Sequence, residues 1–253
     1  YKLFPEVASR LLPSQSMDVN DSAESIARIV VNDFCVEMSF PSRRASATPA
    51  LVGLIAILLN KFFLNLPYCM PIVWIARRKG FKNMQRCYGP DLFEMLMRKS
   101  ANTILTHFLC GGKEGVAEEL KVVCEKKFEN HNIVGTYCPP FKEIEETEMQ
   151  LLGETIGKSK ADIIWIGLGA PKQEKFAAAL SKYTDVAFIF TIGAAFDFYT
   201  NRQKQAPRWI QQTGFEWLFR LLMEPKRLGK RYAEVIPKFI WLNFVSLIKK
   251  VPK

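Results

Sequence analysis

The stretch that decides the fold reads Asp162-Ile-Ile-Trp-Ile-Gly-Leu-Gly-Ala-Pro-Lys-Gln-Glu174, a short apolar run that leads into glycines. An apolar run of this kind, bounded by glycine, is typical of a buried strand. Pro171 suits the first turn of a helix, which we predict over residues 172–180. A second apolar strand is predicted over 186–192, followed by a turn at Gly193-Ala-Ala-Phe-Asp197. Strand, helix and strand in this order indicate a parallel sheet.

The same alternation of strands and helices extends upstream. Strands are predicted over 102–109 and 132–137, and helices over 90–100, 114–129 and 142–158. A short helix is also predicted over 21–31, because Asp21 is a good N-cap and Glu24 occupies the capping-box position. The remainder of residues 1–48 has no sustained period. We therefore predict an α/β fold, a Rossmann-like parallel sheet with helices on both faces.

Positive charge is concentrated at the C-terminal end of the chain. The protein has a net charge of +10, and residues 201–253 contain twelve basic and three acidic residues, a net +9. Trp and Phe side chains are interleaved with these cations, which suits an amphipathic helix on an anionic membrane surface. Nucleic acid is the alternative partner for this positive charge. A protein that binds a nucleic-acid backbone needs fewer large aliphatic residues, so nucleic-acid binding is not expected. We predict a catalytic domain over 1–200 and a helical, membrane-docking appendage over 201–253.

Other composition features exclude some classes of protein. The longest apolar run, residues 51–59, is about half of a membrane span, so a buried or interfacial helix is expected there. The six cysteines include no Cys-x-x-Cys pair and there are two histidines, so we expect reduced thiols and no metal site. The acidic run 143–148 is read as the solvated face of a helix.

Glycines follow each of three predicted strands, at Gly111-Gly112, at Gly167 and Gly169, and at Gly193. Ligands of parallel sheets bind beyond the carboxyl ends of the strands, and glycine lets the backbone approach them closely. Lys172 adds positive charge at a predicted helix start that favours phosphate. We predict that these loops, with the polar side chains of Gln173 and Glu174, bind a phosphate-bearing ligand. The spacing matches neither a P-loop nor the full G-x-G-x-x-G pattern, so ordinary tight turns are the alternative.

Three further side chains are candidates for chemistry. Asp197 follows a strand between two aromatic residues and could hold a sugar hydroxyl or act as a base; a helix N-cap is the alternative. Arg86 precedes a helix start and could bind a diphosphate through two hydrogen bonds; a surface arginine is the alternative. Asp91, in the first turn of that helix, is a second candidate carboxylate.

The chain also carries a series of motifs in a fixed order. They read Met70-Pro71, Arg86-Cys-Tyr-Gly-Pro-Asp-Leu92, Ile166-Gly-Leu-Gly-Ala-Pro-Lys-Gln-Glu-Lys-Phe176, Ile192-Gly-Ala-Ala-Phe-Asp-Phe198, Ala206-Pro207, Glu216-Trp217, Arg220-Leu221, Glu224-Pro225, Arg227-Leu228 and Arg231-Tyr232. Together these motifs resemble the WecG/TagA/CpsF family of bacterial glycosyltransferases. The resemblance covers about residues 67–245.

The resemblance implies an activity and a location. It implies inverting transfer of N-acetylmannosamine or a related hexosamine from a UDP-sugar to a polyprenyl-diphosphate-linked sugar, in cell-surface polysaccharide or teichoic acid synthesis. It also implies a cytoplasmic protein bound peripherally to the inner face of the cell membrane, with metal-independent chemistry and no cofactor. By motif position, Gln173 and Arg86 would lie in the pocket, and Arg220, Arg227 and Arg231 would face the diphosphate. Self-association is left open.

Two departures from the family pattern concern catalysis. The family usually reads Pro-Asp-Gly-Met-Pro, and its aspartate is the proposed general base; here the stretch is Pro67-Tyr68-Cys69-Met70-Pro71. A phenol that is protonated at neutral pH is a poor base, so Asp197 or Asp91 would have to replace the carboxylate. The family's Thr-x-Asn strand is not recognisable in residues 1–66, which diverge from the family pattern. An active transferase, a family member that binds UDP-sugar with impaired catalysis, and a basic membrane-binding module are the three interpretations.

Overall fold

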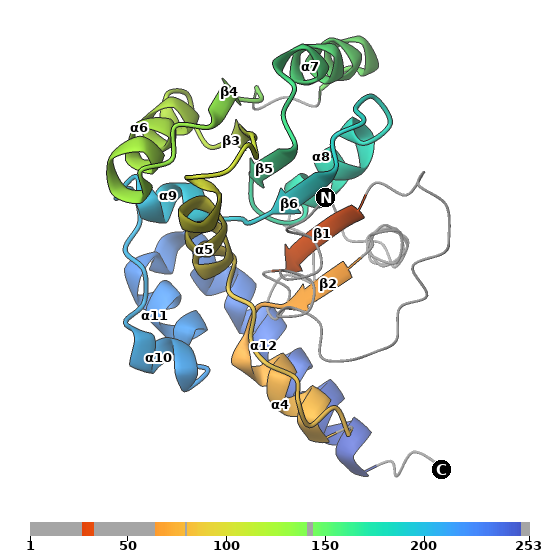
Figure 1. Ribbon diagram of the computed structural model, residues 1–253. Helices are drawn as coiled ribbons and strands as arrows, with labels where there is room; N and C mark the ends of the chain where they lie inside the picture. The colour runs from red at the N-terminus through yellow and green to blue at the C-terminus, as the bar shows by residue number, and fades with distance from the viewer. Residues whose placement is uncertain (1–26, 33–63, 79, 141–143, 249–253) are drawn as a thin grey trace.

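The computed structural model describes residues 27–32, 64–78, 80–140 and 144–248 (Figure 1). Within these ranges lies a six-stranded sheet of order β2-β1-β6-β5-β3-β4. Its strands are β1 (Ala27–Asn32), β2 (Leu64–Pro67), β3 (His107–Gly111), β4 (Ile133–Tyr137), β5 (Ile163–Gly167) and β6 (Phe188–Thr191). Every neighbouring pair of strands is parallel. The prediction of a Rossmann-like α/β fold is confirmed.

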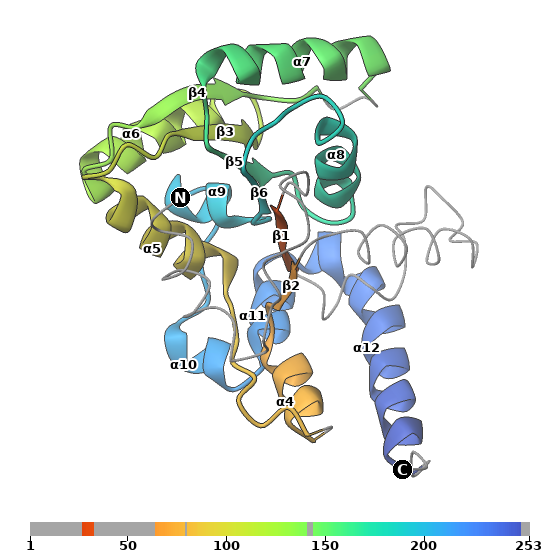
Figure 2. The ribbon, with the colours of Figure 1, turned by 45° about the vertical axis from the view of Figure 1, so that its right-hand side comes forward.

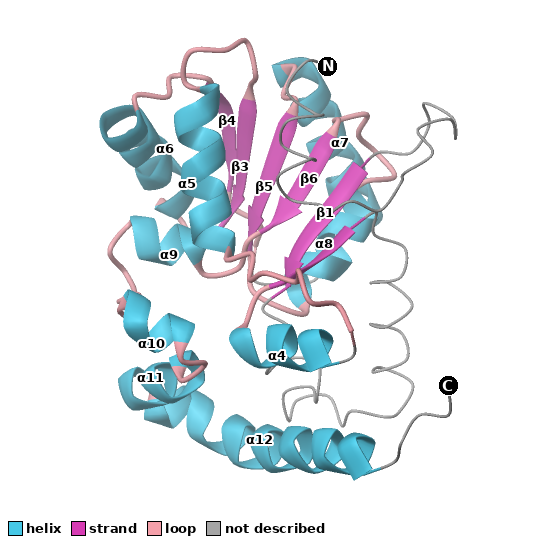
Figure 3. Cartoon of the chain, turned by 60° about the horizontal axis from the view of Figure 1, so that its bottom comes forward, coloured by secondary structure: helices cyan, strands magenta, loops and turns pink. Residues whose placement is uncertain are grey.

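Helices cover both faces of the sheet. The helices of the described ranges are α4 (Met70–Arg78), α5 (Gly89–Ser100), α6 (Val116–Phe128), α7 (Glu146–Ser159), α8 (Lys172–Leu180), α9 (Ala195–Tyr199), α10 (Arg208–Gln212), α11 (Glu216–Met223) and α12 (Pro225–Ile248). Buried side chains of α5, α6 and α9 form one apolar cluster with the sheet, and those of α7 and α8 form a second cluster on the other face (Figure 3). The chain therefore has the layered core that its alternating pattern predicts.

Trp165 of β5 is the centre of the first cluster. Its ring lies edge-on to Phe93, with ring centroids 4.9 Å apart, and stacks on Phe190 at 4.7 Å. Its indole N–H donates to His107 Nδ1 at 3.1 Å, and His107 Nε2 lies 2.8 Å from Ser100 Oγ. Burial lowers the pKa of His107 to about 4, so the ring is neutral at physiological pH. This histidine is a hydrogen-bonded part of the core.

Several predicted boundaries need correction. The helix expected over 21–31 is wrong for its second half, because residues 27–32 form the strand β1. Its run of β-branched residues, Ile29-Val30-Val31, suits a strand that pairs on both edges. The strand expected over 102–109 begins at His107. The turn expected at 193–197 is where helix α9 starts, so Asp197 is helical.

Helices α10–α12, which we call the appendage, lie at the carboxyl edge of the sheet together with α4. Figure 3 shows the strand arrows pointing toward these helices, and Figure 2 shows α12 extending away from the sheet. None of the helices in the described ranges is long and apolar enough to cross a membrane. The apolar run 51–59 lies outside the described residues, and the domain boundary at residue 200 stays a prediction.

Candidate active site

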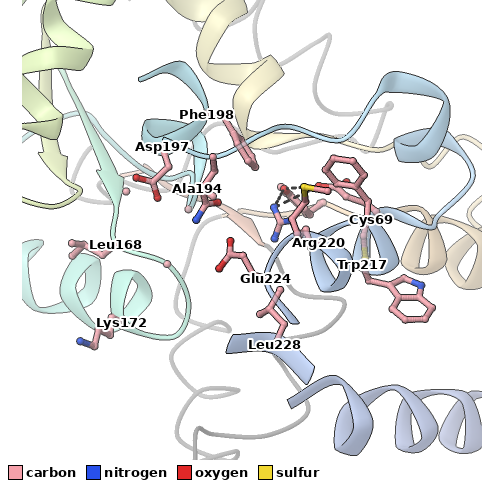
Figure 4. A pocket seen from close by; sticks show the side chains of 18 of the residues that line it. Cys69, Leu168, Lys172, Ala194, Asp197, Phe198, Trp217, Arg220, Glu224 and Leu228 are labelled. Atoms are coloured by element: carbon pink, nitrogen blue, oxygen red, sulfur yellow. Dashed lines mark hydrogen bonds and ion pairs between the residues drawn. The ribbon is translucent and has the colours of Figure 1, made fainter. Parts of the chain in front are cut away.

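A cavity of about 1390 Å³ lies between the carboxyl ends of the strands and helices α4, α11 and α12. On the sheet side it is lined by the loops that follow β3, β5 and β6, and on the other side by the appendage. Figure 4 shows Asp197 and Lys172 on the first side and Arg220, Glu224 and Leu228 on the second. The cavity therefore lies where parallel sheets bind their ligands.

The glycine loops approach one another closely at this edge. A Cβ at Gly111 would lie 2.6 Å from the carbonyl oxygen of Gly167, which accepts the N–H of Gly112 at 2.9 Å. A Cβ at Gly167 would in turn lie 2.7 Å from the ring of Phe196. Gly112, Gly167 and the later glycines at 169 and 193 line the cavity. The predicted convergence of the three loops is therefore seen.

Gln173 is buried and is not among the described residues that line the cavity. Its Oε1 accepts the backbone N–H of Gly193 at 3.0 Å, and its Nε2 donates to Glu174 Oε1 at 3.0 Å. Glu174 is buried beside it. Gln173 thus ties the loop after β6 to the start of α8. Its position favours a role in holding Gly193 over direct contact with substrate.

Arg86 is also not among the described residues that line the cavity. Its Nε donates to the carbonyl of Tyr68 at 2.5 Å, and its Nη1 donates to Gln211 Oε1 at 3.1 Å. Its Nη2 forms a 2.5 Å ion pair with Glu216 Oε2, with both side chains about one-tenth exposed (12% and 11%). The guanidinium also lies over the ring of Tyr88, 4.2 Å from the ring centroid. Each nitrogen of the Arg86 guanidinium therefore has a hydrogen-bond or ion-pair partner within the protein. The diphosphate contact predicted for Arg86 stays a prediction.

Glu216 connects Arg86 to a second arginine, Arg220, which lines the cavity. Arg220 Nη2 donates to Tyr68 Oη at 2.8 Å and lies near Glu216 Oε1 at 3.5 Å, to which Tyr68 Oη also donates at 3.3 Å. We call the five residues Tyr68, Arg86, Gln211, Glu216 and Arg220 the arginine clamp. It joins the core to α10 and α11. Sequence reasoning missed Gln211 and the role of Glu216, because their partners lie 125 to 148 residues away along the chain.

Comparison with known protein families decides the class of this site. Residues 55–252 match the sequence model of the glycosyl transferase WecG/TagA/CpsF family. The chain belongs to this family. The match covers β2 and everything after it that the structure describes, including the cavity and the appendage. The protein is therefore a glycosyltransferase of polysaccharide synthesis, in a family whose members use a sugar donor and, in general, a lipid-linked acceptor.

The position of the family's proposed base is part of the arginine clamp here. Tyr68 lines the cavity, its ring stacks at a tilt on Tyr88 with centroids 4.9 Å apart, and its hydroxyl bonds to Arg220 and Glu216. The next residue, Cys69, is disulfide-bonded, so the expectation of reduced thiols is wrong at this position. The tyrosine at this position thus helps to hold the appendage.

Of the carboxylates proposed to replace the family's base, one lines the cavity. Asp197 lies in the first turn of α9 and lines it, and the N-cap of α9 is Ala194, so Asp197 is not the cap. Asp91 is exposed in the first turn of α5 and does not appear in the described lining. Although Asp91 as a whole is exposed, partial burial of its carboxyl raises its pKa, against the opposing effect of Arg208. Of these two carboxylates, Asp197 is therefore the one that borders the cavity.

Of the remaining predicted residues, some line the cavity and others have side chains that the structure does not describe. Lys172 is exposed and lines the cavity. Arg227 and Arg231 lie on α12, but their side chains are outside what the structure describes. The Thr-x-Asn strand of the family was not recognised in the sequence, and β1 ends in Val30-Val31-Asn32. No group of three or more potential metal ligands occurs among the described residues.

Replacing Gly169 by alanine should weaken UDP binding at least about tenfold, because a Cβ would stand in open cavity space where the diphosphate is expected. Gly169 lines the cavity with φ +74° and nothing within 4 Å of an added Cβ. Gly115 is a matched control, with φ +79° and equally open space, but it is not part of the described lining. Both variants should lose about 1–2 kcal/mol of stability through backbone strain. Equal UDP affinities of the two variants in calorimetry would refute this placement of the diphosphate.

Proposed function

We propose that this glycosyltransferase moves a hexosamine-type sugar, N-acetylmannosamine or a related one, from a UDP-sugar to a polyprenyl-diphosphate-linked sugar. The observation that carries the proposal is the cavity of about 1390 Å³, with glycine loops and Lys172 at one end and the appendage at the other. Pockets for one small ligand usually measure about 300–1,000 Å³. The volume therefore favours two substrates held together, as transfer requires.

The proposed reaction proceeds with inversion at the anomeric carbon. The acceptor hydroxyl attacks the anomeric carbon while the bond between this carbon and the UDP oxygen breaks. A base takes the proton of the hydroxyl. Asp197 is the proposed base, because it is the carboxylate on the sheet side of the cavity. Backbone N–H groups of the glycine loops, Lys172 and Arg220 are suited to the negative charge that develops on the leaving diphosphate. Gln173 contributes by fixing Gly193.

A screen of UDP-sugars against a short-chain lipid-diphosphate-linked sugar tests the proposal. We expect a product heavier than the acceptor by one hexosamine residue, detected by mass spectrometry, with one donor strongly preferred. The second candidate function is a family member that binds UDP-sugar but transfers slowly, which the replacement of the family's aspartate by Tyr68 favours. Saturable UDP binding without product from any donor would support that alternative and refute the proposed activity.

We further propose that the appendage docks on the anionic inner face of the cell membrane. Large apolar side chains are exposed on all of its helices, including Trp209 on α10, Leu222 on α11 and Trp241 on α12. Exposed cations, among them Lys226 and Lys230, lie on α12. Apolar and cationic side chains on one set of helices bind anionic bilayers by burial and by charge together. A cytoplasmic location with peripheral membrane binding stays a prediction. Self-association stays open.

Reversing two appendage cations, in the double variant Lys226→Glu and Lys230→Glu, should lower binding to anionic vesicles at least about tenfold. Each basic residue near an anionic surface contributes about 1 kcal/mol, and reversal adds repulsion. The matched control is Lys99→Glu with Lys126→Glu, two exposed cations in the last turns of α5 and α6. Flotation assays should show weakened binding of the first pair alone, and stronger salt dependence in the wild type. Equal losses in both pairs would contradict docking through the appendage.

A further inference from the structure

A row of apolar side chains on α12 lines the cavity at the end farthest from the glycine loops. Leu228, Tyr232, Ile236 and Ile240 are spaced four residues apart, which places them on one face of the helix, and all four line the cavity. With a rise of about 1.5 Å per residue, the row is about 18 Å long. We call it the α12 row. It forms a continuous apolar wall leading out of the site.

Other apolar side chains line the cavity beside the α12 row. Trp74 of α4 and Phe219 and Met223 of α11 line the same cavity. At its outer end the row continues into a second groove of about 520 Å³, which shares Ile236 and Ile240 with the cavity. The inner residues are buried, with 7% of Leu228 exposed, whereas 61% of Ile240 is exposed. The apolar wall thus runs from the buried end of the cavity to the surface.

The two ends of the cavity differ in chemistry. Asp197, Lys172 and the glycine loops lie at the sheet end, and Arg220 and Glu224 lie on the appendage side before the α12 row begins (Figure 4). An elongated amphiphile with a charged head and a hydrocarbon chain matches this order of polar and apolar surface. A nucleotide-sugar has no group that would gain from an apolar wall of this length.

We propose that the α12 row binds the hydrocarbon chain of the lipid-linked acceptor. The inference rests on the proposed function and specifies where the acceptor's first chain segment lies. The row is suited to the acceptor rather than to bulk membrane lipid, because it is continuous with the cavity that holds Asp197. Leu222 and Trp209, by contrast, are exposed on the appendage and are not among the described lining residues. Binding of the acceptor should therefore depend on the length of its hydrocarbon chain.

Calorimetry with inorganic pyrophosphate and with geranyl, farnesyl and geranylgeranyl diphosphate, below their micelle-forming concentrations, tests the inference on the full chain. Affinity should rise about tenfold with each added isoprene unit until the row is covered, because each buried methylene adds to binding. The variant Ile240→Asp should bind pyrophosphate as the wild type does, but gain no affinity at the longest chains. The matched control Leu222→Asp, with 67% of the side chain exposed, should keep the full chain-length dependence.

Two results would overturn the inference: equal affinity for pyrophosphate and all prenyl diphosphates, or loss of chain-length dependence in Leu222→Asp as well as in Ile240→Asp. The second result would indicate general surface hydrophobicity instead of a built site. The outcome is separable from that of the proposed function. Chain-length dependence without sugar transfer supports the α12 row and refutes the activity, whereas transfer with no chain-length dependence does the reverse.

Discussion

Replacing Glu216 by alanine should destabilise the protein by about 3–5 kcal/mol, because it leaves the buried guanidinium of Arg86 without its carboxylate. The two side chains are 12% and 11% exposed and their ion pair is 2.5 Å long. Arg86→Ala should also destabilise the protein but cost less, since the carboxylate then keeps Arg220 at 3.5 Å as an ion-pair partner. The double variant should cost much less than the two single losses added together. Urea denaturation of the three variants measures these free energies of unfolding.

An exposed ion pair provides the matched control for the arginine clamp. Arg202 and Glu119 are 2.8 Å apart, but their side chains are 44% and 45% exposed. Solvent screens such a pair, so Glu119→Ala should cost less than about 1 kcal/mol. If Glu216→Ala proves no more costly than Glu119→Ala, the clamp does not hold the appendage to the core. Measuring both stability and UDP affinity of Arg86→Ala tests whether Arg86 is structural. If Arg86 instead binds the diphosphate, its replacement should lower UDP affinity without a large change in stability.

The sheet and its helices could be predicted well from local pattern. Helix α8 begins at Lys172 and ends at Leu180 as predicted, because Pro171 and the preceding glycines mark its start. Strand β4 covers all but the first residue of its predicted range. Strand β1 was missed, because a capping pattern at Asp21 and Glu24 was weighed above three β-branched residues. In the folded chain those residues pair with β2 and β6, and long-range pairing overrides local propensity.

The place of the glycine loops in the fold could be predicted from the sequence, whereas the contacts of individual side chains could not. The glycine loops converge because parallel strands end at one edge, which the strand pattern alone implies. The direction of Arg86 could not be read from its neighbours, because its ion-pair partner Glu216 is 130 residues further along the chain. The role of Gln173 could not be predicted either, because its side-chain amide oxygen accepts the N–H of Gly193, 20 residues further along the chain. Side chains rich in hydrogen-bond donors and acceptors serve structure and catalysis equally well, and tertiary contacts decide which.

Replacing Asp197 by asparagine should lower kcat by about 10²–10⁴-fold, the usual contribution of general-base assistance. The amide keeps the shape of the carboxylate but cannot take the proton of the acceptor hydroxyl at neutral pH. Because asparagine has nearly the same shape as aspartate, and Asp197 lines the cavity from the first turn of α9, its replacement should leave the fold intact. UDP affinity should also be unchanged, since the proposed base acts on the acceptor. Steady-state rates and calorimetry on one preparation measure both quantities.

Asp91→Asn is the control, because Asp91 is the other carboxylate that could replace the family's aspartate. It also lies in the first turn of a helix, but on the surface of α5 and outside the described lining of the cavity. Its replacement should therefore leave kcat unchanged. A large loss of kcat in Asp91→Asn, with none in Asp197→Asn, would show that the base is Asp91 and that the acceptor approaches from α5. Wild-type rates in both variants would mean that neither Asp197 nor Asp91 takes the proton.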